Sequence, residues 1–189
     1  QVDALLAAFS LDNHAYKLNA LERLYRLSLE TLQLPEALTR GRVTGRRAGV
    51  DELETLTTWR VAFSIESLGE ADSPELRAQC RESVERSVAD GAMWVLEADG
   101  EPVACSAFNA ALPEAVQVGG VFTPPHLRGR GHGRAAVAAS LRDARAEGAE
   151  LAVLFTDEDN VPAQRAYAAL GFTQVGHFRL ALLAQPARA

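Results

Sequence analysis

The sequence predicts an α/β (α+β) domain in which a mixed central sheet is flanked by helices. Three observations predict this class. Strand-like and helix-like segments alternate along the chain, Asp99-Gly100 gives a strong hairpin signal, and a glycine-rich loop joins an apolar strand to a helix. Strand-like segments outnumber helical ones and a hairpin precedes the glycine loop, which disfavours a doubly wound dinucleotide fold.

Composition narrows the class of protein further. The chain has 189 residues, of which 48% are apolar, so it can form one core of ordinary size. Its formal net charge of −6 disfavours nucleic acid and anionic membranes as partners. No apolar run reaches membrane-spanning length, and nothing resembles a signal peptide. Cys80 and Cys105 fit no metal spacing, so we expect no metal site, reduced thiols and a cytoplasmic location.

Residues 1–40 carry neither of the motifs described below. Residues 2–9 are helix-like, and residues 21–34 alternate in a way that a strand would. Residues 25–29 weakly resemble residues 178–182, which is explained either by chance or by descent of the N-terminal part from an upstream, related domain. Residues 39–44 are expected to be a linker. We therefore divide the chain into an N-terminal extension, 1–40, and a main domain, 41–189.

The first half of the main domain is predicted to contain three strands and two helices in the order β, α, α, β, β, at residues 42–48, 52–68, 73–89, 92–97 and 102–109. Asp51 can cap the first helix, whose apolar residues recur at helical spacing. Ser73-Pro74 is a typical helix start, and Asp90-Gly91 ends that second helix. Asp99-Gly100 then joins the two strands of the hairpin.

The second half continues in the order β, α, β, α, β, at residues 115–123, 133–147, 151–155, 160–170 and 172–183. Gly119-Gly120 within the first of these strands predicts a bulge or a close backbone approach. Gly148 and Gly171 end the two helices. Residues 151–155 are continuously apolar, which predicts a strand that is buried on both faces.

The loop before the helix at residues 133–147 has the features of a phosphate site. Free backbone N–H groups and the helix dipole favour an anion at a helix start, and glycines let the backbone approach it closely. No Gly-Lys-Ser/Thr follows, and Arg134 stands where a dinucleotide motif needs glycine. A solvated turn is the alternative interpretation. The candidate pyrophosphate-binding residues are Arg128, Gly129, Arg130, Gly131, His132, Gly133 and Arg134.

Two motifs together resemble one family. Arg128, Gly131 and Gly133 match the acetyl-CoA motif of the GCN5-related N-acetyltransferases (GNAT), and the string from Asn160 to Phe172 resembles the family's second signature. The resemblance is strong over residues 103–183, plausible over 42–102 and absent before. It implies the GNAT fold, with about six to seven strands that splay at the acetyl-CoA site and about four helices.

The resemblance also implies roles for individual residues. The backbone of Val121, Phe122 and Thr123 would contact the pantetheine arm as an added strand does. Asn160 and Ala163 would face the cofactor, and Tyr167, with an ordinary pKa of about 10, would protonate the departing thiolate. The alternative for Tyr167 is a packing residue of the core.

The expected reaction is direct transfer of an acetyl group from acetyl-CoA to a primary amine of a small molecule or protein. A base must accept the amine proton, and the candidates are Glu66, Glu114 and Asp157. None of them lies in a sequence motif that identifies a base, and the alternative for each is a solvated carboxylate. By the resemblance, the first two helices would form the substrate wall, where Trp59, Phe63 and Glu66 lie at helical spacing; core packing explains Trp59 and Phe63 equally well. The rival interpretations are a non-catalytic acyl-CoA-binding regulatory domain and, more distantly, a nucleotide-binding module. A homodimer is a further expectation.

Overall fold

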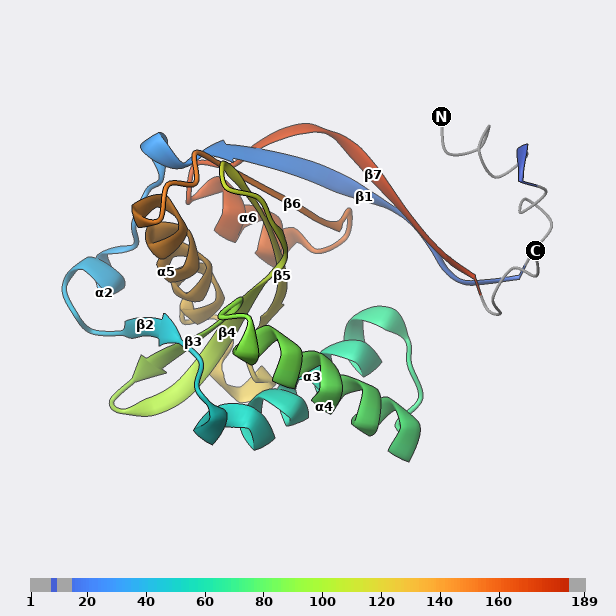
Figure 1. Ribbon diagram of the computed structural model, residues 1–189. Coiled ribbons are helices and arrows are strands. Elements are labelled where there is room, and N and C mark those ends of the chain that lie inside the picture. The colour runs from blue at the N-terminus through green and yellow to red at the C-terminus, as the bar shows by residue number, and fades with distance from the viewer. Residues whose placement is uncertain (1–7, 10–14, 184–189) are drawn as a thin grey trace.

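The computed structural model describes residues 8–9 and 15–183, and its main feature is one seven-stranded sheet with the strand order β2-β3-β4-β5-β6-β1-β7 (Figure 1). All neighbouring strands are antiparallel except β5 and β6, which are parallel. The strands are β1 (Tyr16–Ser28), β2 (Thr44–Arg47), β3 (Met93–Ala98), β4 (Glu101–Ala111), β5 (Ala115–Phe122), β6 (Leu151–Asp157) and β7 (Thr173–Leu183). The mixed α/β class is confirmed.

Five α-helices lie in the described part of the chain: α2 (Glu36–Thr39), α3 (Leu53–Leu68), α4 (Pro74–Ala89), α5 (His132–Ala146) and α6 (Val161–Ala168). The last four were predicted within two residues at nearly every end. The single turn of α2 was not, because it lies between the strand expected at residues 21–34 and the linker expected at residues 39–44. None of these helices is long and apolar enough to cross a membrane.

The helices cover the two faces of the sheet differently. In Figure 1, α5 and α6 lie on one face, while α3 and α4 lie on the other. Alternate residues of β3 divide accordingly: Leu96 belongs to the core cluster under α5, and Met93 and Val95 belong to the cluster under α3 and α4. This alternation is the two-residue period of a strand buried on both faces.

β6 is buried on one face only, which corrects the prediction for residues 151–155. Ala152 and Leu154 are buried, whereas Val153 and Phe155 are only half-buried. The reason is that α3 and α4 pack against β5 and β3 and do not extend over β6. Phe155 instead stacks on Phe178 of β7, with ring centroids 4.2 Å apart.

β1 is a strand of the main sheet, so the predicted boundary at residue 40 does not separate two structural units. β1 lies between β6 and β7 and pairs with both. Tyr25, Leu27 and Leu29 are buried in the same core cluster as α5. Whether the N-terminal part descends from an upstream domain stays a prediction, and the helix expected at residues 2–9 lies almost wholly outside the described residues.

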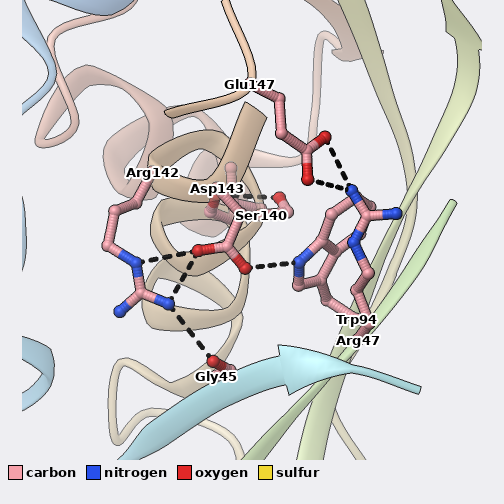
Figure 2. A network of polar contacts seen from close by, with 8 residues as sticks. Gly45, Arg47, Trp94, Ser140, Arg142, Asp143 and Glu147 are labelled. Carbon is pink, nitrogen blue, oxygen red and sulfur yellow. Dashed lines mark hydrogen bonds and ion pairs between the residues drawn. The ribbon is translucent and has the colours of Figure 1, made fainter. Parts of the chain in front are cut away.

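A polar network fixes α5 against the sheet (Figure 2). The indole N–H of Trp94 on β3 donates to Asp143 at 2.9 Å, and Arg142 joins the same carboxylate to the Gly45 carbonyl on β2. A Cβ on Gly45 would lie 2.2 Å from the Cβ of Ala139, so only glycine allows this close approach. The network holds the helix whose first turn forms the candidate site.

Candidate functional site

The sheet opens between β5 and β6. The two strands pair only at Ala115–Leu151, Val116–Ala152 and Gln117–Val153. Beyond these positions they have no pairing with each other, although β5 continues to Phe122 and β6 to Asp157. The edge of β5 that faces β6 therefore carries backbone groups that an extended ligand can pair with. This opening agrees with the splay beside the glycine loop that the family resemblance implied.

Gly119 and Gly120 form the predicted irregularity in β5. The register between β4 and β5 shifts between Cys105 and Ala107 and again between Phe108 and Ala110. A Cβ on Gly119 would lie 2.2 Å from the side chain of Asn109, and Gly120 has a φ of +57°. The left-handed conformation at Gly120 favours glycine, whereas a side chain at position 119 would require the exposed Asn109 side chain to move.

The loop between β5 and α5 forms an anion-binding nest. Gly129 and Gly131 have φ angles of +77° and +81°, and Gly131 is the N-cap of α5. Within the described chain, the backbone N–H groups of residues 129–134 donate no hydrogen bond. Six consecutive free donors at the positive end of a fifteen-residue helix suit a pyrophosphate.

Val121 and Thr123 lie beneath this nest. A Cβ on Gly133 would lie 3.3 Å from the Thr123 hydroxyl oxygen and 3.8 Å from a Val121 methyl carbon, so the first turn of α5 rests on the end of β5. Phe122 points to the other face and packs its ring against Trp59, 6.3 Å between centroids. The side chains of these three residues thus alternate between the two faces of the sheet, and their backbone lies at the edge of the opening.

The cationic side chains of the loop have different environments. Arg128 donates to both carboxylate oxygens of Glu66, at 2.8 and 2.7 Å, and to the Thr123 carbonyl at 2.9 Å. Its charge is therefore already paired, which the sequence did not indicate. Arg130 and Arg134 have no such partner among the described residues, and the Nε of Arg134 is buried without a hydrogen bond. These two guanidinium groups are the better phosphate ligands.

His132 is half-buried at the start of α5. Burial, and secondarily the charge of Arg130, lower the pKa of its imidazole from the usual value. A lowered pKa keeps the ring neutral at pH 7. His132 therefore offers its ring as a neutral hydrogen-bonding group beside the nest.

Tyr167 lies on α6 in the core cluster that also contains Val118 of β5 and Leu154 of β6, the strands that diverge. Its ring packs against Tyr25 and Phe172, with centroids 6.5 and 6.0 Å away. The hydroxyl makes no hydrogen bond with any described residue. Burial raises the pKa of Tyr167 to about 12, above the ordinary value assumed from the sequence. The phenol is thus a proton donor that stays neutral throughout the physiological range.

Asn160 caps α6 as predicted. Its side-chain oxygen accepts the backbone N–H of Ala163 at 3.2 Å, and Pro162 occupies the first turn. Asn160 is exposed and Ala163 is half-buried. The three-to-four residue spacing places Asn160, Ala163 and Tyr167 along one side of the helix.

A cavity of about 210 Å³ lies on the opposite face of the sheet, between α3, α4 and strands β3 to β5. Trp59 and Phe63 line it and also pack against the core cluster beneath α3, so their place in a substrate wall stays a prediction, and Gly120 of the β5 bulge lines the cavity floor. Cys105 also lines it, and burial raises the pKa of this thiol to about 12. A thiol that stays protonated is a poor nucleophile.

The predicted base candidates are not gathered at this cavity. The Arg128 guanidinium, through its hydrogen bonds, lowers the pKa of Glu66, so this carboxylate is a weak base. Glu114 is exposed in the β4–β5 turn, at the opposite end of β5 from the glycine loop. Asp157 accepts the Asp159 N–H at 2.7 Å in the turn before α6. No carboxylate or imidazole is among the described residues that line the cavity.

Glu22 is a titratable residue that the sequence reasoning missed. It lies on β1 directly opposite Asp157 on β6, and burial, followed by the charge of Asp157, raises its pKa. Glu22 was not a candidate because residues 1–40 were assigned to an N-terminal extension that carries neither motif. The pair marks the end of β6 beside the opening.

Comparison with known proteins agrees with this geometry. The model of the acetyltransferase (GNAT) family matches residues 53–172, which is more than half of the chain. The protein therefore belongs to the acetyltransferase (GNAT) family. No curated protein matches the chain.

Solved structures show the same fold. A GNAT-family acetyltransferase from Colwellia psychrerythraea is 19% identical with a TM-score of 0.64, over 94% of this chain and 61% of that one. A GCN5-related N-acetyltransferase from Kribbella flavida is 26% identical with a TM-score of 0.60, over 86% and 58%. The chain thus spans less than two thirds of these two proteins. A predicted acetyltransferase with acetyl-CoA from Clostridium acetobutylicum is 17% identical with a TM-score of 0.55, over 70% and 91%.

Proposed function

We propose that this protein is an acetyl-CoA-dependent N-acetyltransferase that transfers the acetyl group directly to a primary amine of a small molecule or protein. The observation that carries the proposal is the row of six free backbone N–H groups at residues 129–134, placed beside the opening between β5 and β6. A pyrophosphate needs several donors at one point, and an extended pantetheine arm needs an unpaired strand edge. Both requirements are met next to each other.

The residues present fit CoA. The N–H groups of residues 129–134, with Arg130 and Arg134, would hold the pyrophosphate, and the backbone of residues 121–123 would line the pantetheine arm. Asn160 and Ala163 would lie along the other side of the opening. The neighbour from Clostridium acetobutylicum that is described with acetyl-CoA supports this assignment. When bound, acetyl-CoA supplies an activated thioester as the acetyl donor.

The residues of the chain favour direct transfer over a covalent enzyme intermediate. Cys105 is the thiol at the cavity, and its raised pKa keeps it protonated. Tyr167 stays neutral and can donate its proton to a leaving thiolate. Because no carboxylate or imidazole among the described residues lines the cavity, we assign removal of the amine proton to water.

The test combines binding with turnover. Calorimetry should detect CoA binding, and a panel of primary amines with acetyl-CoA should release free thiol above the rate without amine. CoA binding without turnover on any amine would instead favour the regulatory acyl-CoA-binding domain. That alternative is compatible with the absence of a carboxylate or imidazole among the described residues that line the cavity. An absence of CoA binding would refute both. The cytoplasmic location and the homodimer stay predictions.

A further inference from the structure

Arg60 gives the cavity between α3 and α4 a positive charge. It is half-buried on α3 and, apart from the buried Cys105, is the titratable residue that lines this cavity in the described chain. Its guanidinium lies over the ring of Phe63, 5.2 Å from the centroid, and one nitrogen lies 4.0 Å from the position that a Cβ on Gly120 would take. The charge therefore lies beside the β5 bulge, at the floor of the cavity.

This charge has no counter-ion among the described residues. Arg60 takes part in no ion pair or hydrogen bond there, whereas the neighbouring Arg128 binds Glu66 with two hydrogen bonds. The protein as a whole carries a net charge of −6, so carboxylates are abundant elsewhere. A half-buried guanidinium loses part of its hydration, and an anionic ligand that supplies two acceptor oxygens would compensate for that loss.

Further polar groups in the cavity are free to bind a ligand. The Ser83 hydroxyl and the Asn109 amide have no hydrogen-bond partner among the described residues. The Ser87 hydroxyl donates to the Ser83 carbonyl at 3.0 Å, so its oxygen can still accept a hydrogen bond from an amine. The remaining wall is apolar and includes Trp59 and Met93. The cavity thus offers a fixed cation, neutral polar groups and an apolar wall.

We propose that the acceptor is a small amino acid, with a carboxylate beside its primary amine, and that Arg60 determines this specificity by binding the carboxylate. The inference rests on the proposed N-acetyltransferase function and names its substrate class. A volume of about 210 Å³ is below the range of about 300–1,000 Å³ of drug-sized sites, which agrees with a small acceptor. The absence of a lining carboxylate disfavours polyamines and other acceptors with a second cation.

The test measures a preference ratio with matched acceptors. Small α-amino acids, such as L-alanine and L-valine, are compared with their decarboxylated counterparts, ethylamine and isobutylamine, by thiol release at saturating acetyl-CoA. The parent should prefer the amino acid in kcat/KM in at least one pair. Arg60→Ala should reduce that ratio about 10- to 150-fold, the effect of losing a charged hydrogen bond worth about 1.5–3 kcal/mol. Arg60→Glu should turn the preference toward diamines.

Arg40→Ala is the matched control. Arg40 is exposed, pairs with Glu36 in one turn of helix, and does not line the cavity. Its removal changes the net charge as Arg60→Ala does, and the ratio should stay at the parent's value. CoA affinity of each variant is measured by calorimetry, so that a defect in donor binding is recognised.

Four outcomes separate the claims. Turnover of neutral amines without any preference for amino acids would overturn the inference and leave the proposed function intact. A parallel loss on both acceptors, or a loss of CoA affinity, in Arg60→Ala would place Arg60 at the donor site and also overturn it. If CoA binds but no acceptor is turned over, the proposed function fails. In that case, amino-acid binding to the CoA-saturated protein tests the carboxylate site by itself. Binding to the parent that is lost in Arg60→Ala would support the site, and no binding to the parent would refute it.

Discussion

Replacing Gly131 with valine tests the phosphate nest most directly. Gly131 has a φ of +81°, and a Cβ there would meet only an Arg134 nitrogen at 3.8 Å, which is an ordinary contact. The protein therefore leaves room for the side chain, and the cost to folding is the left-handed conformation, about 1–2 kcal/mol. For a chain of this length, that corresponds to a fall in Tm of about 2–8 °C. The new methyl groups, however, would stand where the backbone must approach a phosphate.

The matched control is Gly41→Val. Gly41 has a φ of +68° and has nothing within 4 Å of a Cβ, but it lies in the turn after α2. Both variants should lose similar stability in a thermal melt. Calorimetry should show CoA affinity falling about 10- to 150-fold in Gly131→Val, since one charged hydrogen bond is worth about 1.5–3 kcal/mol, and staying unchanged in Gly41→Val. If Gly131→Val binds CoA as tightly as the control, the nest is not the phosphate site.

Three more predictions concern the rest of the site and sheet. Tyr167→Phe should lower kcat by about 10²–10⁴-fold without lowering Tm, because the hydroxyl has no partner among the described residues; an unchanged kcat would leave Tyr167 a packing residue. Leu27→Ala should cost about 2–5 kcal/mol in urea unfolding while Leu21→Ala, on the exposed part of β1, costs under about 1 kcal/mol; equal costs would contradict the placement of β1 in the core. Glu22→Gln should raise Tm at pH 7–8, and the gain should vanish near pH 4, because a carboxyl with a raised pKa stabilises the fold only while protonated. A gain that persists at pH 4 would have another cause.

The sequence alone indicated most of the fold because its signals are local. Ser73-Pro74 starts a helix and Asp99-Gly100 turns a hairpin through the backbone conformations of the residues themselves. The place of β1 depends on pairing between residues that are far apart, such as Leu27 with Ala152, and no local pattern specifies such a partner. The half-exposure of Phe155 was missed for a related reason, since it depends on how far α3 and α4 extend over the sheet.

The features of the candidate site also fall into two groups, those that a local motif indicated and those that depend on packing. The glycine loop and the Asn160–Tyr167 helix were recognisable because each is a contiguous motif with fixed spacing. The pairing of Arg128 with Glu66 was not, because 62 positions separate the two residues and only the packing of α3 beside the loop brings them together. The free charge of Arg60 was invisible for the opposite reason: a sequence cannot show that a cation lacks a partner.

The proposed direct transfer requires the opening between β5 and β6, because the donor and acceptor sites lie on different faces of the sheet. The helices α5 and α6, which carry the nest and Tyr167, cover one face of the sheet, and the Arg60 cavity lies on the other. A continuous sheet would separate a donor on the first face from an acceptor on the second. Pairing between β5 and β6 ends at Gln117–Val153, and Gly120, three residues further along β5, already lines the cavity. In the proposed mechanism, the end of strand pairing and the bulge would together be the place where the acetyl group crosses the sheet to reach the amine.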